Sequence, residues 1–206
     1  MQNLVLASRN SKKTKELATL FAPAGIHLLN VHNFPTAPHV EETGATFAEN
    51  AAQKASQVAS SLTQWTLADD SGLAVAGLNG APGVHSARYA GEPSSDRRNN
   101  EKLLQQISSL PAEQRTAQFV CHLVIADPTG KIYLRAEAAC RGRILSAPQG
   151  TIGFGYDPLF LVPEYSQTFA ELSLAVKNCL SHRARAFRQL LRKLAKQPIH
   201  SAEADR

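Results

Sequence analysis

The first thirty residues alternate between two apolar runs and one amphipathic run, and this alternation constrains the fold more than any other feature. Residues 3–8 and 26–31 are apolar enough for buried strands. Residues 11–22, between them, place three large apolar side chains on one helical face. A strand, a helix and a strand in this order predict a βαβ unit, since parallel strands need a crossover connection. The chain is therefore expected to be an α/β protein.

The rest of the chain continues the mixture of helices and strands. Periodicity and turn residues predict helices over 46–61, 95–110 and 181–196, a short strand over 66–69, and two long strands over 116–127 and 131–145. The glycine-rich segment 150–158 predicts a loop. Neither an internal repeat nor a linker interrupts this pattern. We expect a single domain over residues 1–197 and a short C-terminal tail over residues 198–206.

The composition excludes several classes of protein. Apolar residues make up 43% of the chain and charged residues 19%, which is ordinary for a globular domain. No apolar run approaches the roughly 18 residues of a membrane span, and the first residues resemble a strand and not a signal peptide. The three cysteines are odd in number and show no paired spacing, which indicates reduced thiols. We therefore expect a cytoplasmic protein without a membrane partner.

The positive charge of the chain is concentrated in two segments. Residues 9–16 and 177–196 together carry eleven positive charges and one negative charge, whereas the whole chain has a net charge of +5. A coat that binds nucleic acid would be spread more widely over the chain. Two local clusters favour a single binding site for a polyanion.

The first basic cluster falls where a predicted strand ends and a helix begins. Free backbone N–H groups and the helix dipole attract anions at such a position. The segment lacks the glycines of a Walker loop, and taken alone it also fits a solvated helix end. The candidate phosphate contacts in this turn are Ser8, Arg9, Asn10, Ser11, Lys12 and Lys13.

Two pairs of acids provide candidate metal ligands. Glu41 and Glu42 precede the second predicted helix, where they also fit as acids that favour a helix N-terminus. Asp69 and Asp70 are expected to follow directly on the short strand, at the end where α/β proteins place ligands. Adjacent like charges are costly unless something neutralises them, and a bound metal ion would do so.

Three further segments carry candidate binding residues, although Arg88 also fits a structural ion pair. The loop Gly153–Pro158 alternates two aromatic residues with glycines and includes a carboxylate, so it offers a stacking surface for a base. The segment Gly80–Gly91 fixes a tight loop from which Arg88 is expected to project. The residues Ser181-His182-Arg183 open the last basic helix.

Taken together, the segments ADDSGL, GAPGVHSARYAG, GFGYDP and SHR resemble the family of inosine/xanthosine triphosphate pyrophosphatases. The resemblance extends from about residue 3 to residue 195. It implies an elongated mixed β-sheet with flanking helices, two lobes around a central substrate cleft, and a homodimer. It also implies Mg²⁺-dependent hydrolysis of ITP, dITP and XTP to the monophosphate and pyrophosphate.

The same resemblance implies roles for individual residues. Asp70 matches the catalytic acid–base residue, and Glu42 and Asp70 match the magnesium ligands. Arg9 stands where the family usually has glycine, and Ala175 and Val176 stand where it often has acids. Substrate contacts are implied for Ser8, Arg9, Asn10, Ser11, Lys12, Lys13, Ser71, Phe154, Gly155, Tyr156, Asp157, Lys177, His182 and Arg183.

Several alternatives remain open at this point. A nucleic-acid-binding module would explain the basic terminal helix but not the acids near the phosphate turn, so we expect no nucleic-acid partner. A related pyrophosphatase for other modified nucleotides would differ mainly in the base loop. The residues leave open which of Asp69 and Asp70 acts on the attacking water, and which residue excludes GTP.

Overall fold

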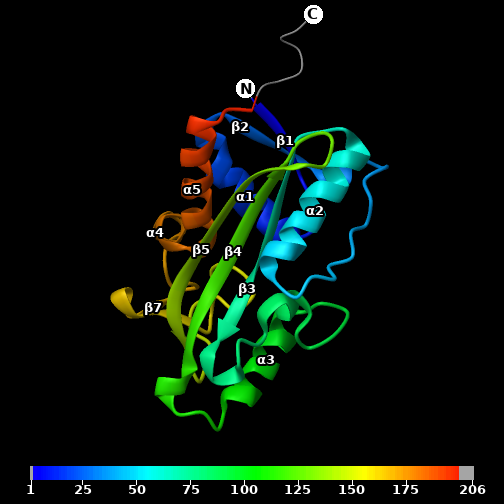
Figure 1. The fold of residues 1–206 in the computed structure, drawn as a ribbon. Coiled ribbons are helices and arrows are strands. Elements are labelled where there is room, and N and C mark those ends of the chain that lie inside the picture. Colours follow the sequence, from blue (N-terminus) through cyan, green and yellow to red (C-terminus); the bar gives the residue numbers. More distant parts are fainter. Residues whose placement is uncertain (1, 200–206) are drawn as a thin grey trace, which may run out of the picture.

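A computed structural model describes residues 2–199 of the chain as one mixed, seven-stranded sheet with helices on both faces (Figure 1). The strands lie in the order β2-β1-β3-β4-β5-β6-β7. The strands are β1 (Gln2–Leu6), β2 (Ile26–Asn30), β3 (Thr66–Val75), β4 (Thr116–Ala126), β5 (Ile132–Ile144), β6 (Phe160–Val162) and β7 (Gln167–Thr168). The helices are α1 (Ser11–Phe21), α2 (Phe47–Leu62), α3 (Asp96–Ile107), α4 (Leu174–Leu180) and α5 (His182–Lys196).

The sheet is parallel at one edge and antiparallel over the rest. Strand β1 pairs in parallel with β2 and with β3, as the βαβ pattern predicts. From β3 onward each strand pairs antiparallel with the next, and the long β3–β4 and β4–β5 ladders form the spine of the molecule. The predicted α/β class with an elongated mixed sheet is confirmed.

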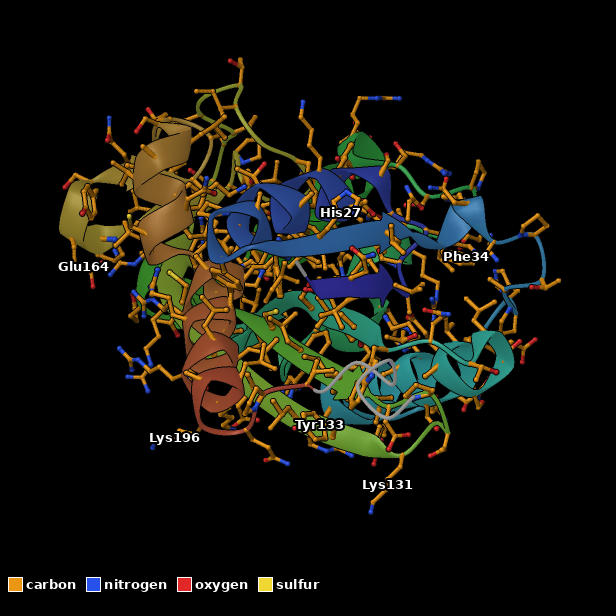
Figure 2. The ribbon with its side chains drawn as sticks, turned by 90° about the horizontal axis from the view of Figure 1, so that it is seen from above. His27, Phe34, Lys131, Tyr133, Glu164 and Lys196 are labelled. Carbon is orange, nitrogen blue, oxygen red and sulfur yellow. The ribbon has the colours of Figure 1, made fainter. Side chains whose placement is uncertain are left out.

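Three helices cover the two faces of the sheet at one end. Helices α1 and α5 share one core cluster with β1, β4 and β5, and their rings Phe21 and Phe187 pack 4.5 Å apart. Helix α2 packs on the opposite face, where Ala51, Ala55 and Val58 lie against the strands. Figure 2 shows this end from above, with α5 and α2 on different sides of β4 and β5. Both faces of the sheet are therefore buried at this end.

A second core lies at the other end of the long strands. Leu73 and Val75 of β3 pack there with Leu103 and Ile107 of α3 and with Phe160. Because β3, β4 and β5 run through both cores, the two lobes share one continuous set of strands (Figure 1). The predicted two-lobed architecture is thus built on a common sheet.

The predicted short strand over residues 66–69 is wrong in length and in the position of its acids. Strand β3 continues for ten residues to Val75, and its ladder with β4 pairs Asp70 with His122 and Gly72 with Val120. Asp69 and Asp70 therefore lie inside a strand and not after it. The segment Asp-Asp-Ser-Gly is typical of a turn, but pairing with β4 overrides that local preference.

The remaining predicted elements are present, with ends shifted by a few residues. The predicted turn at 128–130 joins β4 to β5, and Ser95 caps α3 through a bond from Arg98 N. Strands β6 and β7 and helix α4 were not predicted. Ile199 packs in the first core, so the packed chain continues past residue 197, and residues 200–206 of the predicted tail lie outside the described residues.

Gly72 allows the closest contact between β3 and the loop that follows it. A Cβ at this position would lie 2.2 Å from Ser86 Oγ and 2.9 Å from Gly83 O. The Ser86 hydroxyl fills this space, accepting from Leu73 N at 2.9 Å and donating to Gly83 O at 2.6 Å. The glycine therefore fixes the loop that carries Arg88 against the strand that carries the acids.

We expect Gly72→Ala to lower the free energy of unfolding by about 1–3 kcal/mol, the usual cost of overpacking a buried site. Urea unfolding followed by circular dichroism measures this change. The control is the same substitution in a Ser86→Gly background, which removes the two nearest atoms and should reduce the cost. An equal cost in both backgrounds would contradict this explanation.

Candidate active site

Two adjoining pockets open where the lobes meet. The larger pocket has a volume of about 590 Å³ and is lined by the phosphate turn, the loop around Glu42, and β3. The smaller pocket, of about 80 Å³, lies between the loop at Phe154 and the start of α5. Asn10, Lys13 and Ser71 line both pockets. A ligand that fills both would pass over these three side chains.

The phosphate turn is organised by the N-cap of α1. Asn10 Oδ1 accepts from Lys12 N at 3.0 Å and from Lys13 N at 3.1 Å, which satisfies two N–H groups of the first turn. Ser8 Oγ accepts from Asn10 N at 3.3 Å. Arg9 extends to Ala37 O at 3.3 Å and lines the larger pocket. Four of the predicted phosphate contacts, Ser8, Arg9, Asn10 and Lys13, therefore lie at this pocket.

The other two residues of the turn, Ser11 and Lys12, line neither pocket. Ser11 is the exposed first residue of α1. Lys12 points toward the other lobe, where its ammonium lies 2.5 Å from Asp96 Oδ2. The same oxygen accepts from Gly155 N at 2.9 Å. Lys12 thus contacts Asp96, which binds the loop Gly153–Pro158 (the aromatic loop), and does not line the larger pocket.

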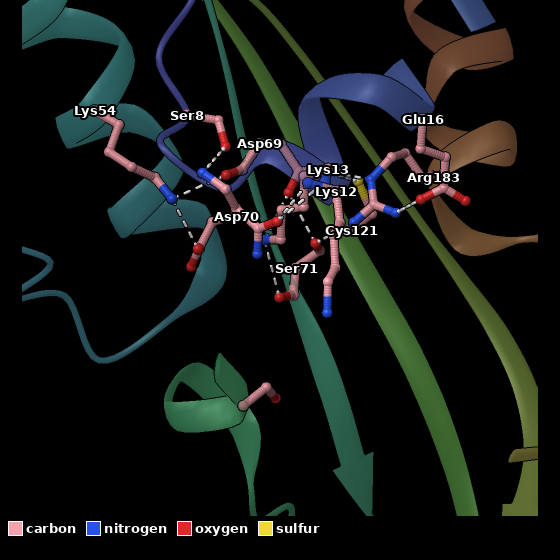
Figure 3. Close-up of polar contacts among 12 residues, drawn as sticks. Ser8, Lys12, Lys13, Glu16, Lys54, Asp69, Asp70, Ser71, Cys121 and Arg183 are labelled. Atoms are coloured by element: carbon pink, nitrogen blue, oxygen red, sulfur yellow. Dashed lines mark hydrogen bonds and ion pairs between the residues drawn. The ribbon is translucent and has the colours of Figure 1, made fainter. Parts of the chain in front are cut away.

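Asp69 and Asp70 project to opposite faces of the sheet, because neighbouring residues of a strand alternate (Figure 3). Asp69 faces α1 and α5, where its carboxylate lies 2.8 Å from Lys13 Nζ and 3.1 Å from Arg183 Nε. Asp70 faces α2 and lies 2.9 Å from Lys54 Nζ. The expected repulsion between adjacent carboxylates is therefore relieved by their opposite directions and by separate cations.

Asp69 is fully buried, and both of its oxygens are occupied. Burial alone would raise the pKa of this carboxyl, but Lys13 and Arg183 outweigh it and hold the pKa well below its usual range. Ser71 Oγ donates to it at 2.8 Å and Cys121 Sγ at 3.2 Å. Asp69 therefore binds side chains from α1, α5, β3 and β4.

Asp70 has a different environment. Burial raises the pKa of its carboxyl, while Lys54 and Lys13 act against that rise. Its Oδ2 atom is buried and has no hydrogen-bond partner among the described residues. Lys54 also lies 2.8 Å from Glu42, and the pKa of Glu42 is lowered because this ammonium outweighs the effect of burial. Glu42 and Asp70 thus line the larger pocket, and Oδ2 of Asp70 has no hydrogen-bond partner among the described residues.

The aromatic loop is held in place by its own aspartate. Asp157 accepts from Phe154 N at 2.9 Å and from Lys177 Nζ at 2.6 Å. Gly153 has a φ of +89°, and a Cβ there would lie 2.1 Å from Asp157 Oδ2. Lys177 Nζ lies 5.2 Å from the centre of the half-buried Phe154 ring. Phe154 therefore presents its ring beside a fixed cation at the smaller pocket.

Tyr156 lines the smaller pocket, but its ring is buried. It is 4% exposed, and its hydroxyl donates to Ser86 O at 2.8 Å. The ring packs in the second core. Its contribution to the smaller pocket is therefore a wall, because the alternation of aromatics and glycines sends its ring inward.

His182 and Arg183 form the inner end of the smaller pocket. The His182 ring stacks on Phe119 with centroids 4.8 Å apart, and burial holds the pKa of this imidazole well below its usual value. Arg183 donates to Asp69, to Glu16 and, at 2.8 Å, to Ser71 Oγ. A guanidinium has five N–H donors, so two remain for a ligand.

Comparison with known proteins identifies the family of this chain. The model of the Ham1 family matches residues 4–193. The chain belongs to the Ham1 family. It is 50% identical to the dITP/XTP pyrophosphatase of Desulforamulus reducens over 96% of this chain and 98% of the relative. It is also 50% identical to the dITP/XTP pyrophosphatase of Rhodopirellula baltica, over 93% and 94% of the two chains.

Solved structures support the membership. The HAM1 protein of Coxiella burnetii superposes with a TM-score of 0.86 at 40% identity, covering 95% of this chain and all of the other. The sheet with its flanking helices described above is therefore that of a Ham1 fold. The family resemblance predicted from four sequence segments is confirmed.

Three charged residues of this Ham1 site were not among the predicted site residues. Lys54 bridges Glu42 and Asp70, Glu16 lies 3.6 Å from Lys177 and contacts Arg183, and Asp96 holds Lys12 and Gly155 N. Charge balance is the signal that finds them. Each buried charge in the predicted site needs an opposite partner, which Lys54 and Glu16 supply, whereas Asp96 pairs with the exposed Lys12.

The second basic cluster is only partly directed at the pockets. Lys177 and Arg183 line the smaller pocket, whereas Arg185, Arg188 and Arg192 are exposed on α5. Arg88 lies at the edge of the larger pocket, 3.9 Å from Glu42.

Among the described residues, no helix is long and apolar enough to cross a membrane. All three cysteines are free thiols.

The neutral state of His182 predicts a specific loss of stability in acid. The unfolded chain binds a proton at this residue below its ordinary pKa of 6.5, whereas the folded chain resists it. Above pH 6.5 the titration of His182 therefore does not lower the free energy of unfolding. Below that value the free energy of unfolding falls by up to about 1.4 kcal/mol for each pH unit.

Denaturant unfolding at pH 7.5 and 5.5 measures this effect. His182→Phe keeps a ring against Phe119 and removes the titrating group, so it should lose less stability between the two pH values than the unaltered protein. The other histidines are present in both proteins and cancel in the comparison. An equal loss in the two proteins would show that His182 is not responsible.

Proposed function

We propose that this Ham1 protein hydrolyses ITP, dITP and XTP to the monophosphate and pyrophosphate. The observation that carries the proposal is the junction of the two pockets. A larger pocket with lysines and acids suits a triphosphate with Mg²⁺, and it joins a smaller pocket with an aromatic ring. The relatives at 50% identity are named dITP/XTP pyrophosphatases, which supports the same substrates here.

The triphosphate would lie along the phosphate turn. Lys13 and Arg9 supply positive charge, the Ser8 hydroxyl is free to donate, and the N-terminus of α1 faces the same pocket. The turn would neutralise and orient the leaving pyrophosphate. Phosphoryl chemistry needs little more from a protein than positioning, charge neutralisation and an aligned water.

We assign the acid–base role to Asp70. A water oxygen forms a bond to the α-phosphorus, the bond from that phosphorus to the pyrophosphate oxygen breaks, and the water proton passes to the carboxylate. Asp70 has an oxygen without a partner and a raised pKa, both of which suit a proton acceptor. Asp69 suits the role poorly, because four donors already occupy its oxygens and its pKa is depressed.

Glu42 and Asp70 are the residues that would hold Mg²⁺. No group of three or more histidine, cysteine, aspartate or glutamate residues that could hold a metal ion is found among residues 2–199. Mg²⁺ needs no such group, since it usually binds through one or two carboxylates together with substrate phosphates. When bound, it would neutralise the phosphate charge and polarise the phosphoryl oxygens.

Base selection would follow from the donors of Arg183. Inosine and xanthosine carry an acceptor oxygen at C6, whereas adenine carries an amino donor. The two remaining donors of Arg183 can bond the oxygen but not the amino group. The neutral ring of His182 has one donor and one acceptor, so it discriminates less. Phe154 would stack on any purine.

We also propose the homodimer that the family resemblance implies, and a cytoplasmic location in keeping with the free thiols. A nucleotide is the partner that the two pockets favour. The exposed arginines of α5 carry charge, but Phe187 of this helix is buried against Phe21 and cannot stack on a base.

Asp70→Asn is expected to lower kcat by roughly 10²-fold or more, the scale of a lost proton-transfer group. Chelator should abolish the activity of the unaltered enzyme, and added Mg²⁺ should restore it. Pyrophosphate release from ITP measures both. Asp127→Asn, in the turn between β4 and β5, is the matched control and should keep normal activity. Full activity in chelator would exclude the metal.

Hydrolysis in ¹⁸O-labelled water identifies the phosphorus that is attacked. We expect the label in IMP and none in pyrophosphate, because attack at the α-phosphorus leaves the water oxygen on the monophosphate. Mass spectrometry of both products, with ITP, XTP, GTP and ATP compared in parallel, tests reaction and substrate class together. Release of orthophosphate and IDP would mean a different hydrolase.

A further inference from the structure

Asp69 lies in the wall between the two pockets and contacts residues of both. Its Oδ1 atom accepts from Lys13 Nζ and from Ser71 Oγ, each at 2.8 Å. Its Oδ2 atom accepts from Arg183 Nε at 3.1 Å and from Cys121 Sγ at 3.2 Å. Lys13 lines both pockets and Arg183 lines the smaller one, so one carboxylate connects the lysine that reaches the larger pocket to the arginine of the smaller pocket (Figure 3).

Ser71 closes these contacts into a ring. Its hydroxyl donates to Asp69 Oδ1 and accepts from Arg183 Nη2 at 2.8 Å, while Arg183 Nε bonds the other oxygen of Asp69. The three side chains therefore hold one another through three hydrogen bonds. Lys13 also bonds Asp69 Oδ1, so a displacement of Lys13 affects the carboxylate to which both Ser71 and Arg183 donate.

Burial makes this ring stiff. Asp69 is 1% exposed and Arg183 is 3% exposed, so water cannot replace a protein partner that moves away. An unpaired charge in such an environment is costly, and the remaining donors must shift to compensate. Cys121, on β4 behind the carboxylate, restricts the direction of that shift.

We propose that Asp69 is a positioning residue that couples base recognition to phosphate binding. A base that bonds Arg183 fixes the carboxylate, and the carboxylate fixes Lys13 for the phosphates. A base that repels Arg183 disturbs the phosphate contact as well. The inference rests on the proposed function, and it assigns Asp69 a role distinct from the proton transfer at Asp70.

The test uses ITP and ATP, which carry the same triphosphate. A residue that contacts only phosphate should change kcat/KM for both by the same factor. Lys13→Ala removes one of the two donors to Asp69 Oδ1, so we expect it to narrow the ITP/ATP ratio of kcat/KM by about tenfold, within the usual range of coupling between sites.

Ser8→Ala is the matched control. Ser8 lies in the same phosphate turn, and the described residues show no bond between it and the ring of Asp69, Ser71 and Arg183. It should lower both values of kcat/KM and preserve their ratio. A preserved ratio in Lys13→Ala, equal to that in Ser8→Ala, would overturn the coupling.

A second variant tests the carboxylate directly. Asp69→Asn keeps the shape and removes the charge, so it should narrow the ratio at least as far as Lys13→Ala. The double variant should then show no further narrowing, because both changes break one connection. If the two substitutions change the ITP/ATP ratio of kcat/KM independently, so that their factors multiply in the double variant, the proposal is wrong. Partial unfolding of Asp69→Asn lowers kcat/KM for both substrates alike and leaves their ratio unchanged.

Failure of the proposed function has a different signature. An unaltered enzyme that shows no preference for ITP over ATP would overturn the selectivity, and the coupling with it. An unaltered enzyme that prefers ITP, with a ratio insensitive to Lys13→Ala, would overturn the coupling alone.

Discussion

The pleat of β3 is the constraint on which the rest of the site depends. Two consecutive aspartates would repel each other strongly on one surface, but in a strand they project to opposite faces. Asp69 then requires cations from α1 and α5, and Asp70 requires a cation from α2. Each face of the sheet is covered by the helices that carry those cations. The placement of helices on both faces and the separate contacts of Asp69 and Asp70 are therefore both related to the alternation of side chains along β3.

The shared strands explain why the two pockets stay in register. Both lobes are built on β3, β4 and β5, so neither can rotate freely about a linker. The contact of Gly72 with Ser86 ties the loop of Arg88 to β3, and Asp96 ties the aromatic loop to α3 and to Lys12 of α1. Buried ionic contacts such as those of Asp69 are costly to break, by about 3–5 kcal/mol when one partner is removed. The site is thus held mainly by contacts that cross between elements.

Local pattern was sufficient for most of the helices and strands and for the residue types of the site, but not for β6, β7 and α4 or for the pairings within the site. The βαβ opening, the long hairpin and the last helix follow from periodicity, and the acids and the aromatic loop stand out by composition. The length of β3 did not follow, because the partner strand that extends it lies some fifty residues away. The partners Lys54, Glu16 and Asp96 were missed for the same reason: a charge partner is set by the fold. The sequence also does not show that the ring of Tyr156 packs in the second core while that of Phe154 stays half-buried at the smaller pocket.

The cap of α1 shows how narrowly one position can be constrained. Asn10 uses its carbonyl oxygen for two backbone N–H groups of the helix, which leaves its amide hydrogens directed elsewhere, at a position that borders both pockets. An aspartate would cap the helix equally well, yet it would offer an anion only repulsion. A serine would cap it too, but its single hydroxyl hydrogen would replace two amide donors. Only a carboxamide satisfies the helix with one end and keeps donors at the other, so a single side chain belongs at once to the scaffold and to the ligand surface.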